Sequence, residues 1–226
     1  MFARIIARLF GNWQTLLISI PVTLIALTVH EFAHGLVSYK LGDPTPKRQG
    51  RLTLNPLAHL DLVGTILMVL TGFGWAKPVQ VDPRYYKNHK VGMAVTAAAG
   101  PLSNLIMAFL AMFLYAVFFF VNIKCNLGWY NAVETTGSIL SLFAVRNLCF
   151  MVFNFIPIPP LDGAKVLGII LPSRIYFTIM QYERYAMILI MVLSLSGALN
   201  VVIGTGVEYI MNGILNLLGG MIRIMI

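Results

Sequence analysis

Long apolar segments without charge constrain this chain more than any other feature. From Trp13 to Val29 there is no charged side chain, and the helix-forming apolar stretch continues to Tyr39. About 20 such residues are enough for a helix to cross the hydrocarbon core of a bilayer. The chain of 226 residues is 58% hydrophobic and 11% charged, whereas a soluble domain is about 45–50% apolar and about 25% charged. The sequence therefore excludes an ordinary aqueous domain and a disordered chain, and it predicts an integral membrane protein.

The order of these segments predicts an all-α polytopic membrane protein with about five to six transmembrane helices. Residues 1–10 suit a short amphipathic helix at the interface, and residues 62–75 are apolar but too short to span, which predicts a re-entrant element. Side chains alternate over Trp75–Val81, so this segment is expected to pair with Arg51–Leu54 in a small β-hairpin or sheet at the membrane surface. The predicted full spans are residues 13–39, 91–122, 136–156, 185–203 and 206–222.

Basic residues outnumber acidic ones, sixteen to eight, for a net charge of +8. In a soluble protein this excess would suggest nucleic acid, but in a membrane protein the cytoplasmic loops collect Lys and Arg, so no nucleic-acid partner is expected. In the predicted layout Arg4, Arg8 and Lys124 fall on one side. Eleven basic residues fall on the other, which is therefore predicted to be cytosolic: Lys40, Lys47, Arg48, Arg51, Lys77, Arg84, Lys87, Lys90, Lys165, Arg174 and Arg184.

An HExxH motif, His30-Glu31-Phe32-Ala33-His34, lies in the C-terminal half of the first predicted span. Four residues turn a helix through roughly 400°, so both imidazoles share one face and can bind a single Zn²⁺. Glu31 lies beside them, where it can accept a proton from a water that zinc activates. Ionisable residues are costly inside a membrane, and a metal gives these three a partner. The alternative is a group of interfacial polar residues without a metal.

Asp162 is the best candidate for a third protein ligand. It is the only acidic residue between Glu134 and Glu183, and it follows a proline-rich break at Pro157, Pro159 and Pro160. Prolines interrupt a helix, so within a membrane this segment must line a cavity enclosed by protein. Asp162 then lies where the helix restarts. The alternative is a turn with a capping aspartate.

These two motifs together resemble the site-2 protease family of intramembrane zinc metalloproteases. The first is His30–His34 inside a membrane helix, and the second is N-x-x-P-x-P-x-L-D-G, matched over Asn154–Gly163. The middle stretch, with GWAKPVQVDP and AAGPLSNL, is similar to compact prokaryotic members without a PDZ domain. The resemblance implies one Zn²⁺ per chain bound by His30, His34 and Asp162, with Glu31 as general base. It also implies cleavage of transmembrane protein or peptide substrates in the plasma membrane of a prokaryote, near the cytosolic face.

One integral membrane protease domain is accordingly expected over residues 1–226, with a catalytic core at about 13–175 and C-terminal helices over 176–226. Asn104 and Asn154 are secondary candidates that could hold the substrate backbone or stabilise an oxyanion. The alternative for each amide is a hydrogen bond between helices.

Two other functions use the same residues. A metal or ion transporter could take His30, His34 and Asp162 as a transit site, since broken helices and ligands at the midplane are typical of transporters. A catalytically inactive membrane scaffold is the second, although all four positions of the motif pair are filled. The sequence does not indicate the physiological substrate, the regulation or the oligomeric state.

Overall fold

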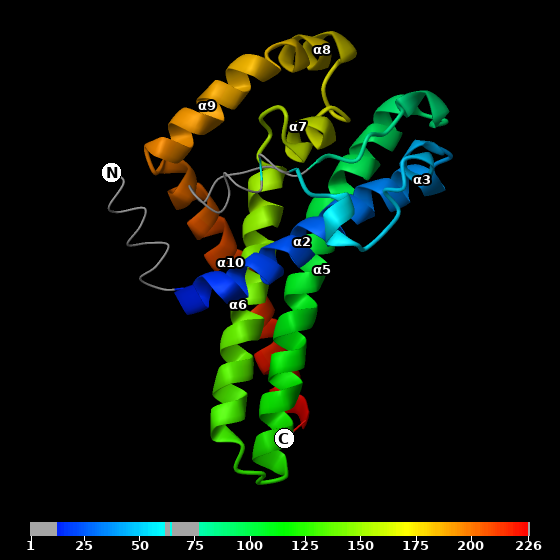
Figure 1. Ribbon diagram of the computed structural model, residues 1–226. Helices are drawn as coiled ribbons and strands as arrows, with labels where there is room; N and C mark the ends of the chain where they lie inside the picture. The colour runs from blue at the N-terminus through cyan, green and yellow to red at the C-terminus, as the bar shows by residue number, and fades with distance from the viewer. Residues whose placement is uncertain (1–12, 62–63, 65–76, 226) are drawn as a thin grey trace.

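The computed structural model describes residues 13–61, 64 and 77–225, and this part of the chain is largely helical (Figure 1). Within it, four helices are long and apolar enough to cross a membrane: α2 (Trp13–Lys40), α5 (His89–Lys124), α6 (Tyr130–Phe155) and α10 (Ala198–Met225). The shorter helices are α3 (Thr45–Arg48), η1 (Pro56–Ala58), η2 (Pro83–Tyr85), α7 (Asp162–Leu167), α8 (Ser173–Gln181) and α9 (Glu183–Leu195).

The long helices α5 and α6 run antiparallel, side by side, and α10 packs against both (Figure 1). Small residues form much of this contact, because Ala108 of α5 and Ala144 of α6 are fully buried and face Val207 and Ile214 of α10. Small side chains let membrane helices approach closely. Helix α2 crosses this bundle obliquely and contacts α5 and α6.

The first three predicted spans are confirmed as α2, α5 and α6. Helix α6 ends at Phe155 and helix resumes at Asp162, so the predicted break at the prolines is also confirmed. The predicted span at residues 185–203 is wrong, whereas the predicted span at 206–222 lies within α10, which is long and apolar enough to cross and begins earlier than predicted. Helix α9 has 13 residues, too few to cross, and α10 already begins at Ala198. The reason is Gly197, whose φ of +80° breaks the apolar stretch where an L side chain would be strained. The described residues therefore contain four spans rather than five to six.

The predicted sheet between Arg51–Leu54 and Trp75–Val81 does not form within the described residues. The Val79 N–H donates to the Glu31 side chain rather than to a neighbouring strand. The Lys77 N–H donates to the His59 carbonyl, outside Arg51–Leu54, and the Asp82 N–H, just after the predicted strand, donates to Asp43. Pro78 has no N–H to donate. Lys77–Val81 is consequently an extended segment that lies along α2. Residues 1–10 and, apart from residue 64, the predicted re-entrant element at 62–75 lie outside the described residues.

Candidate metal centre

His30 and His34 project from one face of α2 toward α5, as their spacing of one helical turn predicts. Their Nε2 atoms lie 3.0 Å apart, and the two side chains are buried. Gly100 of α5 makes this approach possible, because a Cβ atom at that position would lie 2.4 Å from His34 Nε2. The absence of a side chain on α5 thus creates the space in which the imidazoles meet.

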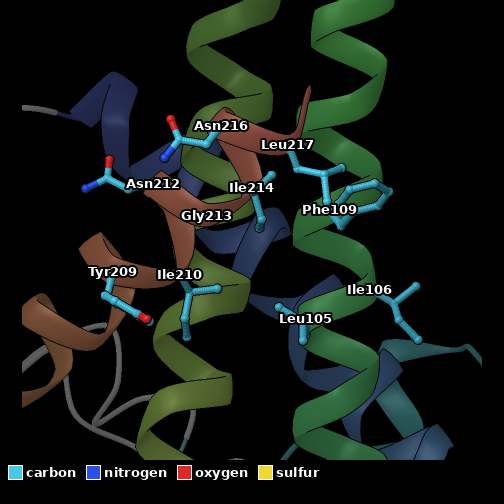
Figure 2. A pocket seen from close by; sticks show the side chains of 10 residues that line it. All are labelled: Leu105, Ile106, Phe109, Tyr209, Ile210, Asn212, Gly213, Ile214, Asn216 and Leu217. Carbon is cyan, nitrogen blue, oxygen red and sulfur yellow. The ribbon is translucent and has the colours of Figure 1, made fainter. Parts of the chain in front are cut away.

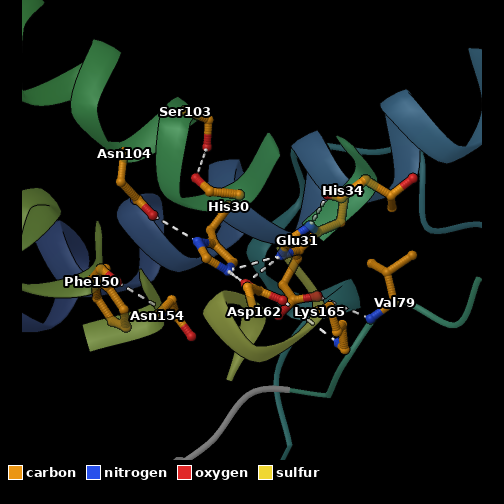
Figure 3. Close-up of polar contacts among 12 residues, drawn as sticks. His30, Glu31, His34, Val79, Ser103, Asn104, Phe150, Asn154, Asp162 and Lys165 are labelled. Carbon is orange, nitrogen blue, oxygen red and sulfur yellow. Dashed lines mark hydrogen bonds and ion pairs between the residues drawn. The ribbon is translucent and has the colours of Figure 1, made fainter. Parts of the chain in front are cut away.

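Asp162 reaches the same point from α7, at the far side of the site (Figure 3). Its Oδ2 lies 3.2 Å from His30 Nε2 and 3.1 Å from His34 Nε2. The carboxylate is 7% exposed, and the proline-rich segment before it brings the helix start back against the end of α6. Three candidate ligand atoms from two distant parts of the chain therefore converge on one point.

The hydrogen bonds made by the Nδ1 atoms of His30 and His34 indicate which ring nitrogen carries the proton. His34 Nδ1 lies 2.7 Å from the Thr96 carbonyl oxygen, which can only accept, so Nδ1 carries the proton. His30 Nδ1 lies 2.7 Å from Asn104 Oδ1, and Asn104 uses its amide group as a donor elsewhere, so His30 Nδ1 also carries a proton. In neutral imidazoles both Nε2 atoms then present lone pairs to each other and to a carboxylate oxygen. This convergence requires a positive charge between them, and two imidazole nitrogens with one carboxylate form a ligand set that catalytic zinc uses.

Asn104 is held in turn by a second asparagine. The Asn104 Nδ2 donates to the Ala26 carbonyl at 3.0 Å and to Asn147 Oδ1 at 2.9 Å. Asn147 Nδ2 donates to the Phe143 carbonyl at 2.9 Å, within α6. Both side chains are fully buried. The chain of bonds fixes which end of Asn104 faces His30, and it links α2, α5 and α6 at the depth of the site.

Glu31 faces a cavity of about 400 Å³ that also borders His30, His34 and Asp162. Its Oε2 accepts a hydrogen bond of 2.9 Å from the backbone N–H of Val79, in the extended segment. This contact holds the carboxylate beside the converging ligand atoms without occupying both of its oxygens. A carboxylate in this place can accept a proton from a group in the cavity.

Asn154 and Asn104, the two secondary candidates, lie at different positions relative to the cavity. Asn154 borders the cavity, and its Nδ2 donates to the Phe150 carbonyl of its own helix at 3.0 Å. Asn104 is fully buried behind His30, and its carboxamide is occupied by His30, Ala26 and Asn147. These hydrogen bonds run between helices, which is the alternative that the sequence left open for Asn104.

The sequence interpretation missed Asn147, Thr96 and Lys165. Asn147 carried a signal, since a polar side chain in the middle of a membrane span is unusual. Thr96 acts through its carbonyl, which side-chain patterns do not reveal. Lys165 Nζ lies 3.6 Å from Asp162 Oδ1 at the edge of the cavity, one turn after Asp162.

A second polar cluster ties the loop after α2 to the start of α5. Ser38 Oγ donates to Asp43 Oδ2 at 2.7 Å and lies 2.7 Å from the Tyr86 hydroxyl, which also accepts from Thr96. The Asp43 carboxylate accepts from the backbone N–H groups of Thr45 and Asp82 as well. Although burial opposes the charged form, these hydrogen bonds hold the pKa of Asp43 below its ordinary value. The cluster anchors the extended segment next to His34.

Comparison with known proteins agrees with this geometry. A family model described as "Peptidase family M50" matches residues 18–197. The chain is 38% identical to the Bacillus subtilis (strain 168) protein named "Putative zinc metalloprotease YwhC", over 75% of this chain and 76% of that protein. It is 26% identical to the Mycolicibacterium smegmatis protein named "Putative zinc metalloprotease Rip2", over 78% of this chain and 66% of that protein. No solved structure matches.

Proposed function

The chain belongs to peptidase family M50, and from this premise we propose that it hydrolyses peptide bonds within the transmembrane segments of membrane proteins. It is a membrane zinc metalloprotease. We propose in addition that it cleaves its substrates inside the bilayer, in regulated intramembrane proteolysis. One observation supports this most directly: His30 and His34 belong to a helix long enough to span, and a cavity opens beside them.

We assign zinc binding to His30, His34 and Asp162. Their burial and convergence fit one ion, and the protons on both Nδ1 atoms leave both Nε2 atoms free to bind it. When bound, zinc supplies a Lewis acid that polarises a peptide carbonyl and makes water a usable nucleophile at neutral pH.

Glu31 is the proposed general base. Its carboxylate accepts a proton as water attacks the scissile carbonyl, and returns it to the nitrogen of the leaving amine. The Val79 N–H holds one carboxylate oxygen at 2.9 Å, so the other oxygen is available for proton transfer. Pre-positioning the base reduces the reorganisation needed in the transition state.

Asn154 is the proposed polar contact for substrate. It borders the cavity, and the one hydrogen bond assigned to it, from Nδ2 to Phe150, leaves its Oδ1 and a second N–H for a peptide group. For Asn104 we propose a different role from the one its sequence context suggested. It positions His30, because its Oδ1 receives the His30 Nδ1 proton.

A helical substrate must be extended before its peptide bonds can be reached. The segment Lys77–Val81 lies at the cavity with an extended backbone, and Pro78, Val79 and Val81 border the cavity. We propose that a substrate adds to this segment through main-chain hydrogen bonds, as in β-augmentation.

The basic residues support a site near the cytosolic face. Helices α3, α7 and α8 lie at the end of the bundle opposite the α5–α6 turn (Figure 1), and the eleven basic residues counted above belong to this end. The bias of cytosolic loops toward Lys and Arg supports this orientation. The proposed location is the plasma membrane of a prokaryote.

The test replaces Glu31 with Gln in the full chain, reconstituted with a single-span model substrate in vesicles. We expect bound zinc to stay at about one per chain while cleavage falls by at least a factor of 100, since a proton acceptor is lost. His34→Ala should lose both the bound zinc and the cleavage activity. A metal transporter, which the comparisons do not favour, would retain transport in Glu31→Gln. Cleavage by Glu31→Gln at the wild-type rate would contradict the proposal.

A further inference from the structure

Helix α10 carries polar side chains on the face that points away from the bundle. Its core face is apolar, with Val207, Ile214 and Leu218 buried against α5 and α6. At about 100° per residue, the opposite face presents four exposed polar residues, which we call the polar face of α10: Thr205, Glu208, Asn212 and Asn216.

The polar face lies in the middle part of α10, a helix long and apolar enough to span, and the middle of a spanning helix meets hydrocarbon. Asn212 is at the middle of α10, and Glu208 lies one turn before it. Within the described residues, Glu208, Asn212 and Asn216 have no hydrogen bond or ion pair. A carboxyl and two amides facing lipid are unfavourable, and such residues almost always face a protein interior or a water-filled cavity. The polar face therefore requires a partner that supplies polar groups.

A groove of about 730 Å³ runs beside the polar face, between α10 and α5 (Figure 2). Leu105, Phe109 and Ile214 supply apolar walls, while Asn212 and Asn216 stand at its edge on α10. Gly213 borders the groove, and a Cβ atom there would meet nothing within 4 Å. Small residues of this kind allow a second helix to come close. The shape and the polar edge together suit a membrane helix with amide or carboxyl groups at matching depth.

We propose that the partner is α10 of a second copy of this chain, packed in parallel to form a dimer. Two copies have the same orientation in a membrane, so residues with the same number lie at the same depth. An amide both donates and accepts, so Asn212 and Asn216 can each pair with the same residues of a second copy. The spacing Thr205, Glu208, Asn212 follows steps of three and four, the seam of a two-helix coiled coil, in which an asparagine sets register and oligomer state.

Glu208 fits the same arrangement. It lies one turn from Asn212, so the Asn212 amide of one copy can donate to the partner's Glu208 across the seam. In a dimer with two-fold symmetry this hydrogen bond between Asn212 and the partner's Glu208 occurs twice. A carboxyl exposed to lipid in the monomer becomes a hydrogen-bonded group in the dimer, and Glu208, Asn212 and Asn216 all gain hydrogen-bond partners.

Energy transfer between labelled copies tests the dimer. In a Cys149→Ala background, the exposed Cys125 carries a donor or an acceptor dye, and the full chain is reconstituted in phosphatidylcholine–phosphatidylglycerol vesicles. We expect energy transfer between the donor and acceptor dyes to persist when the protein is diluted tenfold with lipid. The triple variant Glu208→Leu, Asn212→Leu, Asn216→Leu should lose it. Leucine on a lipid-exposed face favours insertion, so this variant is expected to fold.

Two matched controls sharpen the result. Glu208→Gln keeps a donor and an acceptor, so transfer should stay. In a chain without native cysteines, Asn216→Cys should form a disulfide-linked dimer on oxidation. Leu114→Cys, on the exposed surface of α5 and outside the groove, should not. Transfer that falls to the random level on dilution overturns the proposal, as does unchanged transfer in the triple variant. If Asn216→Cys, oxidised in the native membrane, cross-links only to a different membrane protein, the polar face of α10 binds that protein and the dimer is likewise overturned.

Discussion

His30 Nδ1 lies 2.7 Å from Oδ1 of Asn104, a residue of a different helix 74 positions away. Asn104 cannot rotate freely, because its Nδ2 is bound to the Ala26 carbonyl and to Asn147. The tautomer and the ring orientation of a metal-binding histidine are set by the hydrogen bond of its other nitrogen. Asn104 and Asn147 therefore determine how His30 presents Nε2.

Replacing Asn147 with Leu is expected to weaken zinc binding by about 10- to 100-fold, as loss of an outer partner does in other metal sites. The variant removes no ligand, but it leaves the Asn104 amide free to turn its N–H toward His30. Chelator competition at fixed pH measures the change in zinc affinity, and far-UV circular dichroism verifies the helix content.

Asn154→Leu is the matched control for Asn147→Leu, because both asparagines lie in α6 but only Asn154 borders the cavity. Its zinc affinity should equal that of the wild type, while cleavage falls. Equal zinc affinity in Asn147→Leu and the wild type would show that the bond between the two asparagines does not position His30.

Gly100→Ala is expected to abolish zinc binding and cleavage together. The added Cβ would lie 2.4 Å from His34 Nε2 and 2.7 Å from His30 Cε1, so both imidazoles must move from the point they share with Asp162. Zinc content per chain, measured by mass spectrometry of the metal, gives the result directly. Gly204→Ala is the control in α10, since nothing lies within 4 Å of a Cβ there, and it should keep wild-type zinc.

Asp43 should make the fold sensitive to acid. Its pKa in the folded chain is below the ordinary value, because hydrogen bonds from Thr45, Asp82 and Ser38 outweigh the effect of burial. The stabilisation is therefore fully present above the unfolded pKa of about 3.9 and is lost as pH falls through the folded pKa. Asp43→Asn should reduce the free energy of unfolding by about 1–3 kcal/mol near neutral pH.

Thermal unfolding of Asp43→Asn and wild type between pH 7 and pH 3 measures this effect, and the difference between them should shrink toward pH 3. Arg84→Ala provides the control. This variant breaks the ion pair between the exposed guanidinium of Arg84 and the carboxylate of Asp82. Surface ion pairs contribute little to the free energy of unfolding. A constant difference between Asp43→Asn and wild type across the pH range would exclude the linkage.

The convergence of the candidate metal ligands and the first three spans could be predicted because their signals are local. Two histidines one turn apart share a face whatever the rest of the chain does, and Asp162 stood out as an acid in an apolar segment. The role of Asn104 could not be predicted in this way. It depends on the rotation of α5 against α2 and on Asn147, 43 residues further along, and both are set by tertiary packing.

The errors have the same origin. Residues 185–222 are apolar on both sides of Gly197, and four further glycines follow before Gly220, so hydropathy does not identify the residue at which the helix breaks. Alternation over Trp75–Val81 predicts a strand, and its described part, Lys77–Val81, has neither helix nor strand. The alternation does not reveal that the Glu31 side chain accepts the Val79 N–H, which would otherwise be available to a neighbouring strand.

Proline substitutions in the extended segment separate the two functions proposed for it. Val79→Pro removes the N–H that holds Glu31 and should reduce kcat, even for a short peptide that needs no unwinding. Val81→Pro leaves the Glu31 contact intact but removes a main-chain donor at the cavity. We expect it to raise KM for a transmembrane substrate by about tenfold, the loss of roughly one hydrogen bond. Both variants should retain zinc. If Val81→Pro cleaves the transmembrane substrate with wild-type kinetics, strand addition at this segment is wrong.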